Sequence, residues 1–150
     1  MPTRIPSPRD PRLDTWRTFL HAHAQVRRQL ERELQAEQSM GLGEYELLLV
    51  LAYSHERRLR MSELADTLAL SRSGVTRLID RLEAGSLVRR TSCDTDRRGA
   101  WAELTDAGYD RLRDASPTHL RGVAEHFLDR IPPSDLESLR RILDGVVERA

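Results

Sequence analysis

Apolar residues recur along the chain at spacings of three and four, interrupted by short polar breaks. The first stripe contains Trp16, Phe19, Leu20, His23, Val26, Leu30 and Leu34. This spacing predicts one face of a long helix. After a break at residues 39–43, residues 45–53 form a short apolar run rich in leucine, with few β-branched side chains. That composition favours a second, buried helix over a strand.

The middle of the chain predicts two short helices followed by a β-hairpin. Ser62 is expected to cap a helix over residues 63–68. A second helix is expected from Ser71 or Arg72 to about Ala84. Its inward face contains Val75, Leu78, Ile79 and Leu82, which follow the i, i+3, i+4, i+7 pattern. Residues 87–91 and 100–104 then predict two short strands, joined by a charged tip.

The last third of the chain predicts two more helices. Thr105 is expected to cap a helix that runs from Asp106 to about Phe127, and Pro117 is expected to kink or interrupt it. After a break at Pro132 and Pro133, residues 136–147 form a final apolar stripe. The fold class that follows is mainly α with a minor β part, α+β in the broad sense.

Length and composition limit the domain organisation and the chemistry. A chain of 150 residues favours one domain, which we place at residues 13–150, after a proline-rich and flexible arm at residues 1–12. No apolar run is long enough to span a membrane and no secretory signal is evident, so we expect a cytoplasmic protein. A lone cysteine, Cys93, excludes an intrachain disulfide. We expect no catalytic site, no metal site and no cofactor.

The charges are balanced overall but unevenly distributed. The 24 basic residues are all arginine, and 24 acidic residues match them. Residues 55–100 hold ten arginines and seven acidic residues, whereas residues 101–150 hold seven and ten. A basic middle segment therefore lies beside an acidic one. Any phosphate contact from a charged side chain must use an arginine, whose planar fork suits bidentate contacts.

Two short helices joined by a tight turn, the second with an outer face rich in Arg, Ser and Thr, suit a helix-turn-helix that enters the major groove of DNA. The residues that face away from the predicted core are the candidate DNA contacts: Ser71, Arg72, Ser73, Thr76 and Arg77. The hairpin tip adds Asp96, Arg97 and Arg98. A narrow minor groove attracts arginine, so we expect this tip to act as a wing.

Residues 61–108 resemble the multiple-antibiotic-resistance regulator (MarR) family, most specifically in Asp96-x-Arg98 and in Leu104-Thr105-x-x-Gly108. The resemblance implies a homodimeric winged helix-turn-helix that regulates transcription on a pseudo-palindromic operator. It implies dimerisation helices over 13–54 and 106–150 and a DNA-binding lobe over 55–105. It also implies that Arg98 is the minor-groove arginine, with Asp96 as its partner. One departure is that Ser86 stands where the family usually has a left-handed glycine, one place after Gly85.

The resemblance also implies that a small ligand relieves DNA binding, which makes the chain a ligand-responsive repressor. The aromatic side chains that we expect to line a site for a phenolic or other aromatic effector are Trp16, His23, Tyr45 and Tyr53. The apolar stripes at the two ends exceed what a small winged helix needs to cover, and this independently favours a homodimer. Two other readings stay open: a protein-interaction module that does not bind DNA, and a thiol-based redox sensor through Cys93.

Overall fold

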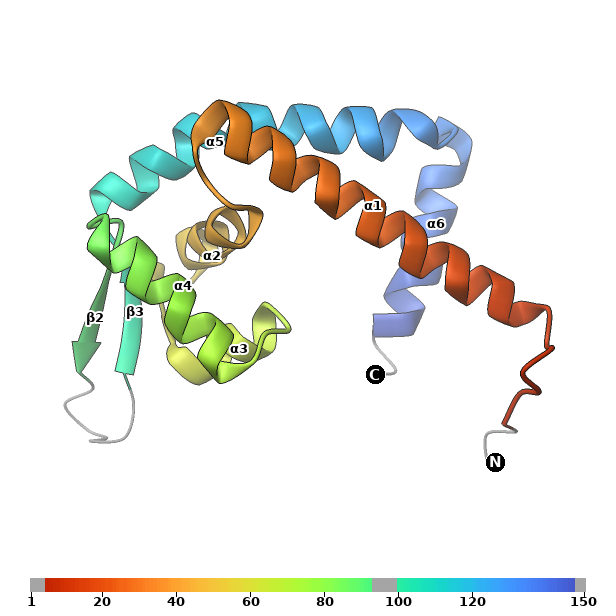
Figure 1. Cartoon of the computed structure of the whole chain (residues 1–150), viewed down its shortest axis with the longest axis horizontal. Helices are drawn as coiled ribbons and strands as arrows, with labels where there is room; N and C mark the ends of the chain where they lie inside the picture. Colours follow the sequence, from red (N-terminus) through yellow and green to blue (C-terminus); the bar gives the residue numbers. More distant parts are fainter. Residues whose placement is uncertain (1–4, 93–99, 148–150) are drawn as a thin grey trace. The chain divides into compact units, whose positions relative to one another are not determined.

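The computed structural model describes residues 5–92 and 100–147, which are mostly helical, with one small sheet. The elements, shown in Figure 1, are α1 (Arg12–Gln38), α2 (Leu42–Tyr53), η1 (His55–Arg57), β1 (Arg58–Arg60), α3 (Met61–Thr67), α4 (Arg72–Ala84), β2 (Val88–Ser92), β3 (Ala100–Leu104), α5 (Asp106–His126), η2 (Leu128–Arg130) and α6 (Pro133–Val147). The predicted fold class is confirmed. None of the helices within these ranges combines the length and apolar character that a membrane span requires.

The chain divides into two compact units. The central unit comprises residues 33–120, and the terminal unit comprises residues 1–32 and 121–150. Helices α1 and α5 each contribute residues to both units. The described part of the predicted N-terminal arm, residues 5–11, contains neither helix nor strand.

The sheet of the central unit has three antiparallel strands in the order β1-β3-β2. Strands β2 and β3 are the predicted hairpin, with Val88 opposite Leu104 and Ser92 opposite Ala100. Strand β1 was not predicted, because three residues reading Arg-Leu-Arg carry too little pattern to distinguish a strand from a loop. Antiparallel pairing with β3, in which Arg60 lies opposite Trp101, makes these three residues a strand.

The hydrophobic core lies in the central unit. Apart from Leu30, every buried hydrophobic side chain among the described residues belongs to it. These side chains are Leu34, Met40, Leu42, Tyr45, Leu47, Leu48, Leu51, Leu64, Ala65, Val75, Leu78, Ile79, Leu82, Val88, Ala102, Leu104, Leu112 and Ala115. They include all four of the residues predicted for the inward face of α4. Each fully buried aliphatic side chain contributes roughly 1.5–3 kcal/mol.

Helix α5 continues through Pro117, so this proline does not interrupt the helix, and the kink that was the other expectation stays a prediction. Contacts on both sides of the proline hold the helix in place. Ser116 donates a hydrogen bond to the Leu112 carbonyl (2.8 Å), and the buried Thr118 accepts one from Gln38 (3.0 Å). The Ser116 bond lies within α5, whereas the Thr118 bond ties the helix to α1 just after the proline.

Tyr45 joins α2 to α5 inside the core. Its ring stacks on His119, with 4.3 Å between ring centroids, and its hydroxyl lies 3.2 Å from that of Ser116. Burial lowers the pKa of His119, which favours the neutral form of this imidazole. Tyr45 therefore packs as a core residue between two helices.

The turn after α4 is tied to the start of α5 by one hydroxyl. The Thr105 hydroxyl donates to the carbonyls of Ser86 (2.8 Å) and Leu87 (3.0 Å), and it accepts the Gly108 N–H (2.9 Å). This confirms Thr105 as the cap of α5. Ser86 has φ = 58°, the left-handed conformation that its place in the motif predicted. A side chain pays a modest steric penalty there, which the Thr105 contact offsets.

The terminal unit buries little of its apolar surface. Trp16 and Phe19 are 55% and 46% exposed, and Ile142 and Val146 are each 63% exposed. No described residue of α6 is buried. The apolar stripes that the sequence predicted for both ends of the chain are therefore present. Leu30 and Leu34 of the first stripe are buried, whereas its N-terminal part and the stripe of α6 stay partly or largely exposed in the single chain.

Gly108 is required by close packing, and replacing it with alanine is expected to destabilise the protein. A Cβ at Gly108 would lie 2.0 Å from the Leu87 carbonyl oxygen and 2.6 Å from Leu104 Cδ1. We expect Gly108→Ala to lower the free energy of unfolding by about 1–3 kcal/mol, the usual range for overpacking. Urea denaturation followed by circular dichroism measures it.

Gly43→Ala is the matched control in the same unit. A Cβ at Gly43 meets only Leu78, at 3.5 Å, which is ordinary van der Waals contact. Gly43 lies in α2, where alanine favours the helix by roughly 0.5–1 kcal/mol. Equal stabilities of the two variants would contradict the steric argument.

Candidate nucleic-acid interface

Helices α3 and α4 are joined by a tight turn over residues 68–71. The Leu70 N–H donates to the Ala65 carbonyl (2.9 Å) and the Ala69 N–H donates to the Asp66 carbonyl (3.2 Å). Ala69 has φ = 51°, so the turn ends α3 in the left-handed manner usual for helix C-termini. Helix α3 begins at Met61, not after Ser62 as predicted, because Glu63 accepts the Arg60 N–H (3.0 Å) and Arg60 is the N-cap. The predicted helix-turn-helix is nevertheless present.

The first turn of α4 engages two of the candidate hydroxyls. Ser71 is the N-cap, and its hydroxyl oxygen accepts the Gly74 N–H (3.1 Å). The proton of Ser71 therefore remains for donation to Ser73, 3.1 Å away, or to a phosphate. The Thr76 hydroxyl donates to the Arg72 carbonyl (2.9 Å), so it can accept but not donate elsewhere. Of these two hydroxyls, Ser71 is the better phosphate donor.

Helix α4 has one buried face and one exposed face. All five of its predicted contact residues are exposed: Ser71, Arg72, Ser73, Thr76 and Arg77. They lie opposite the buried stripe that packs against the rest of the central unit. Figure 1 shows α4 beside α3 and the strands, with one side of the helix clear of the other elements of this unit. The exposed face is free to meet a groove.

The arginines of α4 differ in whether they are paired. Within the described residues, no ion pair involves the guanidinium of Arg72 or that of Arg77. Arg81, one turn further along, pairs with Glu44 of α2 (2.8 Å). The other oxygen of Glu44 accepts the Gly41 N–H (3.0 Å) at the start of α2. Unpaired guanidinium groups are thus confined to the half of α4 that would enter a groove first.

Arg90 of β2 binds two carboxylates of α4. Its guanidinium donates to both Asp80 and Glu83, and its backbone N–H donates to Glu83 (3.0 Å). The bond to Asp80 is the largest cause of a raised pKa of Arg90, so this charge is permanent. Sequence reasoning missed the cluster, although the i, i+3 spacing of the two acidic residues predicts that they share a face of the helix.

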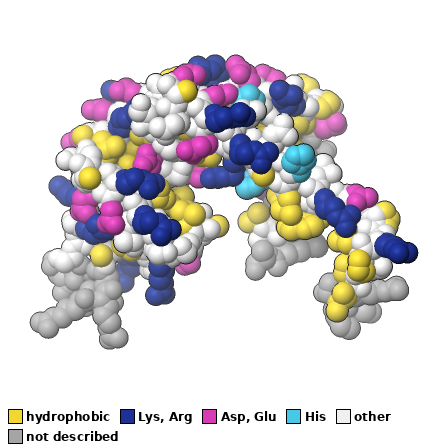
Figure 2. All heavy atoms as spheres, in the orientation of Figure 1, with side chains coloured by type: hydrophobic (Ala, Val, Ile, Leu, Met, Phe, Trp, Pro, Cys, Tyr) yellow, Lys and Arg dark blue, Asp and Glu magenta, His cyan; other side chains and the backbone are white. Residues whose placement is uncertain are grey.

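The outer face of the sheet, opposite α4, carries paired cations. Arg58 and Arg60 of β1 lie over the Trp101 ring, with 5.1 and 5.3 Å from guanidinium carbon to ring centroid. Arg89 pairs with Glu103 at 2.5 Å. Figure 2, which views the molecule from the side of α4, shows basic and acidic side chains intermixed on that face as well. The sheet therefore adds no second surface of free arginines to that of α4 within the described ranges.

The predicted wing tip lies outside the described residues, which resume at Ala100. Asp96, Arg97, Arg98 and Cys93 all fall in this gap. The strands on either side are the expected antiparallel pair, with Ser92 opposite Ala100. The minor-groove role of Arg98 and the thiol hypothesis for Cys93 stay predictions from the sequence.

The four predicted effector-lining residues fall in different environments. Trp16 and His23 lie in the terminal unit, each stacked on Phe19 at 6.1 and 6.3 Å between ring centroids. Tyr45 is in the core of the central unit, with 2% of its surface exposed. Tyr53 is 86% exposed. The structure does not bring the four together around one cavity within either unit.

A groove of about 250 Å³ opens beside Tyr53 in the central unit. It is lined by residues of α2 and α5: Leu49, Ala52, Tyr53, Tyr109, Leu112, Arg113 and Ser116. Arg57 lies over the Tyr109 ring, 4.3 Å from its centroid. The lining combines apolar side chains, two phenols and a cation. Tyr109 and Arg113 were not predicted, because only the packing of α2 and α5 brings them to Tyr53.

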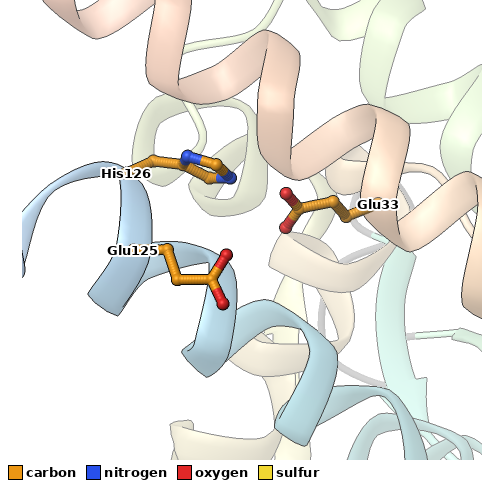
Figure 3. A group of neighbouring side chains, drawn as sticks. All are labelled: Glu33, Glu125 and His126. Atoms are coloured by element: carbon orange, nitrogen blue, oxygen red, sulfur yellow. The ribbon is translucent and has the colours of Figure 1, made fainter.

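Three side chains with metal-binding chemistry are drawn in Figure 3. Glu33 comes from α1, and Glu125 and His126 are consecutive residues at the end of α5. Glu33 belongs to the central unit and the other two belong to the terminal unit. Neither unit by itself holds the three or four ligands of a typical zinc site at this position.

Comparisons with known proteins point consistently to one family. A family model described as MarR family matches residues 39–99. The crystal structure of Sco3205, a MarR family transcriptional regulator from Streptomyces coelicolor solved in complex with DNA, is 40% identical. The match covers 89% of this chain and 84% of the Sco3205 chain, with a TM-score of 0.82. AbsC, a MarR family regulator from the same organism, is 37% identical, with coverages of 98% and 97% and a TM-score of 0.83.

Curated relatives match over a shorter range. The transcriptional repressor MprA of Escherichia coli (strain K12) is 29% identical over 103 residues, which are 67% of this chain and 57% of MprA. The HTH-type transcriptional regulator MhqR of Bacillus subtilis is 28% identical over 85 residues, 57% of this chain. The chain thus spans less than two thirds of the length of these relatives, 57% of MprA and 59% of MhqR.

Proposed function

The chain belongs to the MarR family, and on that premise we propose that it regulates transcription by binding double-stranded DNA. We propose that it binds a pseudo-palindromic operator as a homodimer and acts as a ligand-responsive repressor. Sco3205, which is 40% identical over most of both chains, was solved with DNA, and MprA is named a repressor. Both descriptions support this function.

The observation that carries the proposal is the pairing state of the arginines on α4. A major groove accepts one α-helix, and residues near the N-terminus of that helix reach the base edges. Arg72 and Arg77 lie on this part of α4 without ion-pair partners in the described ranges, beside the Ser71 hydroxyl, which accepts the Gly74 N–H and lies 3.1 Å from the Ser73 hydroxyl. In a chain of balanced charge, this is where a phosphate or guanine finds uncompensated donors.

The terminal unit supports a dimer. Its helices carry amphipathic stripes, yet α6 has no buried residue and Trp16 stays more than half exposed. A second copy of the chain would cover the same apolar face on both subunits, as two-fold symmetry requires. Two recognition helices related in this way would enter successive major grooves about 10 base pairs apart.

The groove beside Tyr53 supports an effector site. Its volume of about 250 Å³ and its two phenols suit a small aromatic compound. Arg113 in its lining would pair with an acidic substituent such as a carboxylate, in competition with Asp110 (3.2 Å) and Asp114 (3.8 Å). We propose a small aromatic acid as the effector class. Such a ligand alters DNA binding only through a difference in its affinity for two shapes of the dimer.

Arg77→Ala tests the placement of α4 in the groove. The operator is first obtained by selecting bound fragments from genomic DNA with the purified protein. We expect Arg77→Ala to weaken operator binding by about 1–3 kcal/mol and to relax the preference at one base pair in each half-site. Fluorescence anisotropy on a set of single-base operator variants measures both effects.

Arg89→Ala is the control for the loss of one positive charge, since Arg89 lies on the outer face of the sheet and pairs with Glu103. Its affinity should match that of the original protein. A uniform loss across all sequences in Arg77→Ala would reassign Arg77 to a phosphate contact. Weak DNA binding by the original protein that does not change with salt would favour the protein-interaction module instead.

Ile142→Glu tests the dimer. Ile142 is 63% exposed on α6, so a charge is tolerated in a single chain but is costly in an apolar interface. We expect light scattering to give twice the chain mass of 17.2 kDa for the original protein and a shift to the monomer for the variant. Leu70→Glu, on the turn before α4, should leave the mass unchanged. A monomeric original protein would remove the two-fold operator model.

Benzoic acid derivatives test the effector site. We expect a ring-hydroxylated benzoate to bind with a dissociation constant in the micromolar to millimolar range, and Tyr109→Ala to weaken this binding about tenfold, equivalent to 1.4 kcal/mol. Isothermal titration calorimetry on the purified protein measures both. Equal binding to the variant would place the ligand elsewhere, and no binding of any member of the series would reject this ligand class.

A further inference from the structure

We propose that Arg90 is a positioning residue for DNA binding, one that neutralises Asp80 and Glu83 so that α4 can approach phosphate groups. The inference rests on the proposed function, since it concerns how the same helix meets DNA. It assigns a role to a strand residue that does not itself belong to the exposed face of α4.

The geometry of the cluster is specific. Side chains alternate along a strand, so Arg89 and Arg90 point to opposite faces of the sheet. Arg89 pairs with Glu103 on the outer face. Arg90 reaches α4, where its two arms bind carboxylates that lie three residues apart, on one side of the helix. The backbone N–H of Arg90 adds a third bond, to Glu83. One guanidinium group thus forms ion pairs with both acidic residues.

The position of Asp80 explains why this neutralisation matters. Asp80 follows Thr76 by four residues and Arg77 by three, so it continues the exposed face of α4 by one more turn. The Asp80 side chain is 58% exposed, whereas that of Arg90 is 31% exposed. A carboxylate in this place would repel the phosphates that the proposed function brings to Arg77. With Arg90 bound, the exposed face presents a paired carboxylate beside arginines that form no ion pair with any other described residue.

A mechanical clamp is the competing explanation, and the two differ in what the carboxylates do. If Arg90 acts only by tying β2 to α4, then removing Asp80 and Glu83 breaks the clamp just as removing Arg90 does. If Arg90 acts by neutralisation, then removing the carboxylates removes the need for it. Neutral amides at both positions therefore separate the two explanations.

The experiment compares operator affinities of full-length variants by fluorescence anisotropy over a series of salt concentrations. We expect Arg90→Gln to bind about tenfold more weakly at about 0.1 M salt, where the Debye length of about 10 Å leaves neighbouring charges unscreened. The loss should shrink at higher salt. The triple variant Asp80→Asn/Glu83→Gln/Arg90→Gln should recover the affinity of the original protein to within about threefold.

Two further variants complete the design. Arg89→Gln also removes one paired arginine from β2, so it controls for net charge and should bind like the original protein. Asp80→Asn/Glu83→Gln, with Arg90 retained, should bind at least as tightly as the original protein. This double variant also keeps the proposal testable if Arg90→Gln fails to fold, which thermal unfolding would reveal.

Several results would overturn the proposal while leaving the proposed function intact. These are undiminished binding by Arg90→Gln, equal losses in Arg89→Gln and Arg90→Gln, or weakened binding by the double carboxylate variant. A triple variant that folds but stays as weak as Arg90→Gln would also overturn it. By contrast, an original protein that selects no DNA sequence would contradict the proposed function itself.

Discussion

The burial of one stripe of α4 is the constraint on which the interface depends. Val75, Leu78, Ile79 and Leu82 are buried against α2, α3 and β2. Turning the helix by one residue would expose part of this stripe, at roughly 1.5–3 kcal/mol for each side chain brought into water. The hydrophobic effect therefore fixes which side of α4 faces outward. The packing of the buried face of α4 therefore decides which polar side chains its exposed face presents.

Ion pairing then determines which of the outward-facing arginines keep an uncompensated charge. The chain has as many acidic as basic residues, so its net charge predicts no affinity for DNA. In the central unit, Arg81, Arg89 and Arg90 bind nearby carboxylates, while the guanidinium groups of Arg72 and Arg77 have no ion-pair partner within the described ranges. The proposed binding surface is thus marked by the arginines that have no ion-pair partner within the described ranges. Local pairing is more informative here than the total charge.

The two units differ in how they are stabilised. The central unit has its own core and a junction in which Thr105 and Gly108 allow α5 to lie directly against the Leu87 carbonyl. The terminal unit leaves large apolar side chains exposed, among them Trp16, Ile142 and Val146. Helices α1 and α5 contribute to both units. In the proposed dimer, the second subunit would supply the burial that the terminal unit lacks.

Local patterns in the sequence predicted the long helices, the helix-turn-helix and the exposed face of α4, because each depends on periodicity or on contacts within a few residues. The left-handed site at Ser86 followed from the family resemblance, and Thr105, 19 residues away, holds this turn. The tertiary structure alone decided that β1 is a strand, that α5 continues through Pro117 and that Arg90 binds Asp80 and Glu83. It also placed Tyr109 beside Tyr53. In each of these cases, contacts between distant segments outweigh a weak or contrary local preference, and no local pattern encodes them.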